Sequence, residues 1–137
     1  MTSSPDGFVP YARSSPYLDL IGPLYESATD PAVVRLQVDG RHTNARGFLH
    51  AGVLVAVADV VMGHTAHRAG PPEAALVTVS LTTDFPGSAQ HGDWVVGHAA
   101  VVRRGRQLAF TSCTFTANHG LVLSASGVFA TVPGARP

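Results

Sequence analysis

The sequence contains no lysine, and all nine of its basic residues are arginines. A Schiff base, a pyridoxal phosphate site and a Walker A phosphate loop each require a lysine amine, so these classes of chemistry are excluded. Cysteine is nearly absent as well: Cys113 stands alone, which excludes an intramolecular disulfide and a thiolate zinc cage. Because no apolar stretch typical of an export signal follows Met1, we expect a cytoplasmic protein.

Charged residues are scarce and balanced. They make up 13% of the 137 residues, against 45% hydrophobic ones, whereas soluble domains usually carry about 25% charged residues. This composition indicates apolar surface that serves a subunit contact or an oily ligand. Nine basic and nine acidic residues cancel, so the net positive charge that favours nucleic acids or anionic membranes is missing. We therefore expect self-association, with neither nucleic acid nor a membrane as partner.

The common signatures of cofactor and nucleophile sites are missing too. Neither a GxSxG elbow nor a GxGxxG phosphate loop occurs. His64 and His67 are three residues apart, but no carboxylate stands at a usual ligand spacing, so a polar helix end explains them better than a metal site. We expect no metal and no redox cofactor.

Hydrophobic periodicity predicts one long helix and several strands in a single domain over residues 16–137, preceded by a flexible polar arm at 1–15. Residues 50–68 are apolar on all sides of a helical wheel, which is typical of a helix buried on every side. The later strands have short connections and are therefore antiparallel. An α+β fold follows, with a curved antiparallel β-sheet wrapped around one long central helix. The expected elements are one or two helical turns at 16–21, a strand at 32–38, a loop at 39–49, the helix at 50–68, and strands at 76–85, 94–102, 108–116 and 121–132.

Asp59 lies in the middle of the apolar helix. A lone buried carboxylate is costly unless it is paired, hydrogen-bonded or neutralised. A helix kink or a hydrogen bond to a strand is the ordinary explanation, but the residues just before the helix favour a functional role. Free backbone N–H groups and the helix dipole attract negative charge there, as an oxyanion site requires. Two imidazoles, a carboxamide and two glycines occupy this segment: His42, His50, Asn44, Gly47 and Gly52.

The chain reads H-x-N-x-x-G-x-x-H-A-G from His42 to Gly52, with Asp59 nine residues after the second histidine. This spacing resembles the phenylacetate-pathway (PaaI-type) acyl-CoA thioesterases of the hotdog fold. Residues 15–25 and 105–111 are similar to the opening segment and the later hairpin of that family. The resemblance implies a single hotdog thioesterase domain over 16–137, with coenzyme A as part of the substrate and no separate cofactor.

The resemblance also implies roles for matching residues. Asp59 is the general base or nucleophile, and Thr78 contacts the water. Asn44 and the N–H of Ala51 hold the thioester carbonyl, while His50 orients groups around it. The family usually has glycine where this chain has Ala51, so a backbone donor survives but the added methyl narrows the pocket or misfits a glycine-only dihedral angle. Further substrate contacts are expected from His42, Gly47 and Gly52.

The positions of His50 and Asp59 on the helix predict a shared site. Nine residues at about 100° each place the two side chains about 180° apart, so they do not easily serve one site within one chain. A two-fold dimer resolves this by presenting Asp59 of one subunit to Asn44 and His50 of the other, as the resemblance also implies. We expect a homodimer, stacked further into a dimer of dimers.

Three arginines cluster at the turn around Gly105: Arg103, Arg104 and Arg106. Their guanidinium groups suit the phosphates of coenzyme A, although a solvated hairpin turn is the simpler explanation of the cluster. The sequence as a whole predicts a hydrolase that cleaves an acyl- or aryl-acyl-CoA thioester to free acid and coenzyme A. Two alternatives are an acyl-CoA hydratase on the same fold and a protein that binds acyl-CoA or a lipid-like ligand without turnover.

Overall fold

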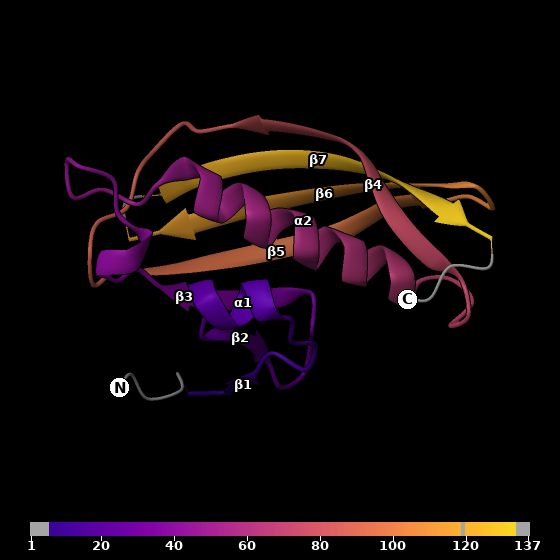
Figure 1. Ribbon diagram of the computed structural model, residues 1–137, viewed down its shortest axis with the longest axis horizontal. Helices are drawn as coiled ribbons and strands as arrows, with labels where there is room; N and C mark the ends of the chain where they lie inside the picture. The colour runs from indigo at the N-terminus through magenta and orange to yellow at the C-terminus, as the bar shows by residue number, and fades with distance from the viewer. Residues whose placement is uncertain (1–5, 119, 134–137) are drawn as a thin grey trace.

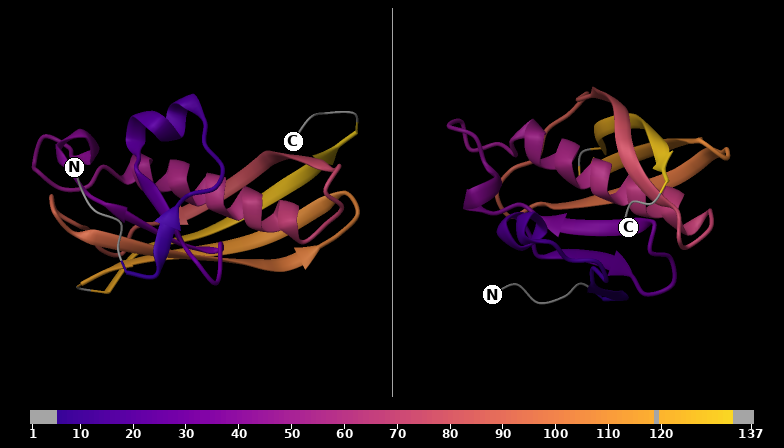
Figure 2. Two further views of the ribbon diagram at one scale, coloured as in Figure 1. Left: turned by 90° about the horizontal axis from the view of Figure 1, so that it is seen from below. Right: turned by 45° about the vertical axis from the view of Figure 1, so that its right-hand side comes forward.

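The computed structural model describes residues 6–118 and 120–133. Within them, one long helix packs against a seven-stranded antiparallel sheet of order β1-β2-β3-β5-β6-β7-β4 (Figure 1). Two further views show the sheet curving around this helix (Figure 2). The elements are β1 (Phe8–Pro10), α1 (Pro16–Ile21), β2 (Leu24–Ser27), β3 (Val33–Gln37), the 3-10 turn η1 (Gly40–His42), α2 (Ala51–Arg68), β4 (Ala75–Asp84), β5 (Trp94–Arg104), β6 (Leu108–Ala117) and β7 (Gly120–Val132).

The central helix α2 buries one face against the sheet. Its inward residues recur at spacings of three and four, as expected for one face of an α-helix. The sheet supplies its own buried side chains at every second position, and β6 shows this alternation most clearly. The helix residues that reach the core are Leu54, Val57, Ala58, Val61, Met62 and Ala66, and they share a hydrophobic cluster with Val95, Cys113, Phe115, Leu123 and Phe129.

Cys113 belongs to this core, in the middle of β6. Its side chain is buried, and burial raises the pKa of its thiol to about 12. A thiol with such a pKa stays protonated at neutral pH and is a poor nucleophile. Cys113 therefore serves packing.

The predicted hotdog fold is confirmed: a curved antiparallel sheet wraps around one long helix, and the expected helix and later strands lie within two residues of their observed bounds. The expectation that α2 is buried on every side is wrong for the single chain. Val55, Ala56 and Val60 on the outer side are only half-buried, because no element of the described chain covers that side completely.

Two short strands were not expected. β1 lies within the expected N-terminal arm and pairs with β2, with Phe8 opposite Ser27 and Pro10 opposite Tyr25. Strands of three and four residues carry too little alternation to be recognised in a sequence. The domain boundary at residue 16 stays a prediction, as does the cytoplasmic compartment. Within residues 6–118 and 120–133, no helix is long and apolar enough to cross a membrane.

Candidate functional site

Asp59 pairs with Thr78 across the gap between α2 and β4. The hydroxyl of Thr78 donates a hydrogen bond of 2.6 Å to Asp59 Oδ1. Asp59 is half-buried on the outer side of α2, and Thr78 lies on β4, which pairs with β7 at the edge of the sheet that the described residues form. Among the described residues, Asp59 Oδ2 has no hydrogen-bond partner. One carboxylate oxygen is thus held in place while the other is available to accept a proton.

A small cavity of about 200 Å³ opens beside this pair. Gly63 brings α2 close to β7 at the cavity wall, because a Cβ at this position would lie 3.1 Å from the ring of Phe129. The side chains around the cavity are both polar and apolar, and they come from the N-terminal segment, α2, β4 and β7. The lining residues are Arg13, Asp59, Val60, Gly63, His64, His67, Leu76, Thr78 and Phe129.

Asn44 organises the loop that leads into α2. Its Oδ1 accepts hydrogen bonds from the N–H groups of Arg46 at 2.9 Å and Phe48 at 3.2 Å. Gly47 takes the tight position of this loop with a φ of 83°, which a residue with a side chain rarely adopts. Because the side-chain oxygen is used within the loop, the exposed Asn44 presents its Nδ2–H₂ donors outward.

The first two backbone N–H groups of α2, those of Ala51 and Gly52, differ in what they contact. His50 caps the helix by accepting the Gly52 N–H at Nδ1 over 3.1 Å. A Cβ on Gly52 would lie 3.3 Å from that nitrogen, so glycine leaves room for this contact. No described residue accepts the N–H of Ala51, and Ala51 has no positive φ. The exposed helix start therefore offers a free donor, and alanine fits the backbone without strain.

His42 has a different environment from the one that its sequence position suggested. It is 1% exposed, its Nδ1 accepts the Asp39 N–H at 2.9 Å, and its Nε2–H donates to the Ile21 carbonyl at 2.5 Å. Both ring nitrogens are occupied, so none is left for a substrate. His42 instead joins η1 to the end of α1.

The expected site residues form two groups in the single chain. Asp59 and Thr78 share the cavity, whereas Asn44, His50 and Ala51 do not line it. Nine residues separate His50 from Asp59, which corresponds to about 13 Å along a helix axis. We call them the carboxylate half-site (Asp59 and Thr78) and the donor half-site (Asn44, His50 and Ala51).

The three arginines at the β5–β6 turn have different environments. Arg104 donates to the Gly105 carbonyl at 2.6 Å and to the Ala66 carbonyl at 3.3 Å, so it holds the C-terminal end of α2. Arg103 and Arg106 are exposed. Arg104 and Arg106 line a separate open cavity of about 410 Å³ at that end of the helix. Within the described chain, this cavity shares no lining residue with the one beside Asp59. The predicted contact of the three arginines with coenzyme A stays a prediction.

A second polar group, which the sequence analysis missed, lies beside Asp59. Tyr11 stacks on His64 with ring centroids 5.5 Å apart, and their Oη and Nδ1 atoms are 2.5 Å apart. Arg13 Nη2 donates to His67 Nδ1 at 3.4 Å. The spacing of the two histidines was visible in the sequence, but no local signal places Tyr11 and Arg13 more than fifty residues away against the same helix.

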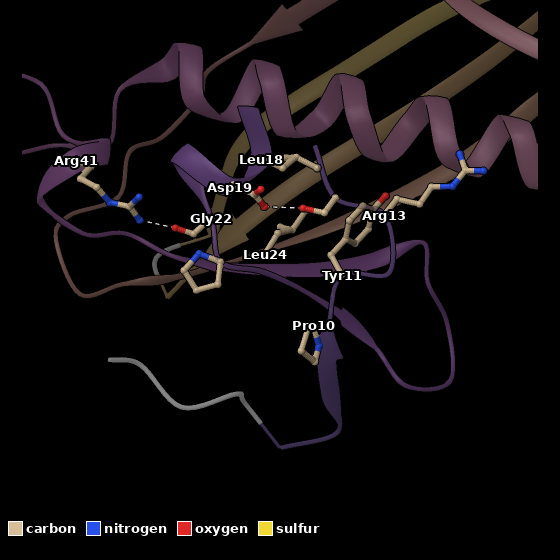
Figure 3. Close-up of a pocket in the computed structure, with 10 residues that line it drawn as sticks. Pro10, Tyr11, Arg13, Leu18, Asp19, Gly22, Leu24 and Arg41 are labelled. Atoms are coloured by element: carbon tan, nitrogen blue, oxygen red, sulfur yellow. Dashed lines mark hydrogen bonds between the residues drawn. The ribbon is translucent and has the colours of Figure 1, made fainter. Parts of the chain in front are cut away.

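Another cavity, of about 430 Å³, lies between the N-terminal segment and α1 (Figure 3). Two of its charged residues, Arg41 and Asp19, are already engaged. Arg41 donates to the carbonyls of Leu20 and Gly22 and pairs with Asp39 at 3.0 Å, which lowers the pKa of that carboxyl group. Asp19 accepts the hydroxyl of Ser14 at 2.5 Å. These contacts hold the N-terminal segment, α1 and η1 together.

Comparison with known proteins identifies the family. The model of the thioesterase superfamily matches residues 46–124, and the chain belongs to this superfamily. "Putative esterase PA0474" of Pseudomonas aeruginosa is 42% identical over 131 residues, which cover 94% of this chain and 98% of that protein. Human acyl-coenzyme A thioesterase 13 is 30% identical over 95 residues, which cover 68% of this chain and 66% of that protein.

Solved structures show the same fold. The PaaI protein of the Escherichia coli phenylacetic acid degradation operon has a TM-score of 0.68 at 23% identity, covering 75% of this chain and 73% of its own. The protein smu.793 of Streptococcus mutans, solved with acetyl-CoA bound, has a TM-score of 0.69 at 23% identity, covering 77% and 82%. The superfamily is thus confirmed, while the narrower PaaI-type assignment stays a prediction.

Proposed function

We propose that the protein is an acyl-CoA thioesterase of the PaaI type, and that Asp59 is its general base. The Thr78–Asp59 hydrogen bond at the mouth of a cavity is the observation that carries the proposal. The carboxylate is held by one oxygen, and the cavity leaves room for a water and for part of an acyl group. The names of the relatives support the substrate class, because one acts on acyl-CoA thioesters and another was solved with acetyl-CoA.

The donor half-site supplies hydrogen-bond donors to the carbonyl oxygen of the thioester. A water that loses its proton to Asp59 attacks the thioester carbon, and negative charge develops on the carbonyl oxygen. The Ala51 N–H and the Asn44 amide are free to donate to that oxygen, and the α2 N-terminus favours the charge. The tetrahedral intermediate then collapses, the C–S bond breaks, and the coenzyme A thiolate leaves and takes up a proton.

The two half-sites lie too far apart within one chain to act on one thioester, so the working site is shared in a homodimer. The half-buried apolar side chains Val55 and Val60 of α2 and the exposed Val77 and Val79 of β4 are consistent with a subunit contact beside Asp59. A further pairing of dimers remains part of this proposal. An acyl-CoA hydratase would want an aspartate and a histidine from one chain at the reacting end of the substrate. Asp59 contacts Thr78 there, and the histidine of the motif, His50, stands about 13 Å away along the helix.

The experiment is steady-state thiol release across short, medium, long and aromatic acyl-CoAs, with wild type and Asp59→Asn. Loss of a positioned base reduces kcat by about 100-fold or more, while the near-isosteric amide keeps the fold, as circular dichroism checks. Binding of acyl-CoA without any thiol release by the wild type would favour a non-catalytic binding protein instead. Near-wild-type turnover by the folded variant would remove Asp59 from its role.

A further inference from the structure

Arg13 stands where three cavities of the N-terminal half meet. It lines the cavity of about 200 Å³ beside Asp59, an adjoining one of about 410 Å³ beneath Ser14 and Ser15, and the one of about 430 Å³ next to α1 (Figure 3). The first two also share Val60 and His64. Residues 11–15, which we call the strap, thus contribute lining residues to all three cavities, and one of these cavities is lined by Asp59 and Thr78 of the carboxylate half-site.

The strap determines which nitrogen of His64 carries the proton. Burial raises the pKa of Tyr11 to about 12, and burial together with the nearby Arg13 and Arg68 lowers the pKa of His64 to about 4. At neutral pH the hydroxyl is therefore protonated and the imidazole is neutral. We take Tyr11 Oη as the donor to Nδ1, which places the hydrogen of His64 on Nε2. No described residue accepts that N–H, and His64 lines the same cavity as Asp59 as well as the adjoining one.

Arg13 adds a positive charge that the described residues do not neutralise. None of them places a carboxylate within 4.0 Å of its guanidinium group. The nearby acidic side chains have other partners: Glu26 accepts the Ala12 N–H at 2.7 Å, and Asp19 accepts the Ser14 hydroxyl. His67 offers no donor to a ligand here, because its Nε2–H donates to the Pro72 carbonyl at 3.1 Å and its Nδ1 faces Arg13.

We infer that the acyl group of the substrate carries a carboxylate at the end remote from the thioester, bound by the guanidinium group of Arg13 and the Nε2–H of His64. This inference rests on the proposed function, because it takes the thioester to lie at Asp59. A cation and a neutral donor together match the two oxygens of a carboxylate. His64 follows Asp59 by five residues, about 7.5 Å along α2, and both side chains line the same cavity, so a short dicarboxylic chain spans the two.

The test compares two ligands of the same shape, glutaryl-CoA and 5-methylhexanoyl-CoA, which differ in having a carboxylate or an isopropyl group at the far end. Isothermal titration calorimetry with Asp59→Asn measures their affinities without turnover. We expect glutaryl-CoA to bind about 10- to 100-fold more tightly, as a charged hydrogen-bonded contact predicts. Taking the ratio of the two affinities cancels any effect on the shared coenzyme A portion.

Variants of the strap then locate the origin of the preference. In the Asp59→Asn background, Arg13→Met is expected to bring the ratio close to one, and Arg13→Lys to retain part of it. Tyr11→Phe should lower the ratio by about threefold, because Nδ1 of His64 then has no hydroxyl partner and the hydrogen of the imidazole is no longer held on Nε2. A ratio near one before any change to Arg13, a ratio that Arg13→Met leaves intact, or no binding of either ligand would each overturn the inference. Thiol release from 5-methylhexanoyl-CoA by the wild type tests the proposed function separately.

Discussion

The donor half-site and the carboxylate half-site use the same helix in opposite ways. At the start of α2, the exposed Ala51 N–H and Asn44 amide are donors without acceptors among the described residues. In the middle of α2, Asp59 has a free acceptor oxygen and a fixed one. Each half-site lacks what the other has, so the proposed thioesterase site needs both half-sites, although they stand about 13 Å apart along one helix.

The largest expected effect comes from recombining the two half-sites. Asp59→Ala and Asn44→Ala are each expected to lower thiol release by about 100-fold or more. When the two variants are co-refolded in equal amounts, half of the dimers are mixed, and each mixed dimer holds one intact site. About a quarter of wild-type activity should therefore return. The measurement is thiol release at fixed total protein, with mixed dimers confirmed by mass spectrometry.

Two controls accompany this mixture. Refolding each variant alone must restore no thiol release. When a double variant is co-refolded with wild type, thiol release must not exceed that of the wild-type homodimers present, because a mixed dimer then holds no intact site. If both residues act within the same chain, the mixture of single variants stays as inactive as its parents, and the shared site is ruled out.

The donor half-site alone is tested by removing one hydrogen atom from the backbone. Proline is accepted at the first position of a helix, and the extended backbone of His50 is compatible with a following proline. Ala51→Pro thus deletes the free N–H while it keeps α2, and we expect kcat to fall about 100-fold. Ala51→Gly keeps the donor and serves as the control. Equal turnover in the two variants would show that this N–H does not contact the oxyanion.

The carboxylate half-site is tested at Thr78, where a smaller effect on kcat is expected. Thr78→Val keeps a β-branched residue on β4 but removes the hydroxyl that holds Asp59 Oδ1. We expect kcat to fall about tenfold, the loss of one hydrogen bond of about 1.4 kcal/mol, with a smaller change in KM. Thr78→Ser should retain most activity. A change in KM alone would mean that Thr78 binds substrate and does not position the base.

The smallest effect concerns stability beside the carboxylate half-site. The pKa of His64 is about 4 in the folded protein, against an ordinary value of 6.5 in the unfolded chain. The unfolded chain binds more protons between these values, so His64 lowers the free energy of unfolding as the pH falls from about 6.5 to about 4 and has no such effect above that range. Urea unfolding at about pH 7 and about pH 5 should show a smaller loss for His64→Phe than for the wild type.

A matched control for this measurement is His91→Gln, which removes an exposed histidine. It should keep the pH dependence of the wild type. The same dependence in His64→Phe would contradict burial of His64 beneath the strap.

Several elements were predictable because their signal is local. The apolar run of α2 and the alternation of β5, β6 and β7 predict those elements within two residues, because burial of one face imposes a fixed period. The motif from His42 to Gly52 was also visible. The structure leaves the Ala51 N–H and the Asn44 amide without acceptors among the described residues, and their contact with the thioester carbonyl stays a prediction. His42 was assigned to the substrate because a motif shows spacing and not burial; in the structure it is 1% exposed.

The sequence by itself determined the helix, the strand pattern and the identity of the chemical groups, since each depends on residues close to one another in the chain. Only the tertiary structure decided which groups meet. Pairing of β4 with β7 at the sheet edge brings Thr78 to Asp59. Pairing of β1 with β2 places the strap against α2, where Tyr11 contacts His64, fifty-three residues away in the sequence. Such contacts depend on the curvature and order of the whole sheet, which no local period encodes.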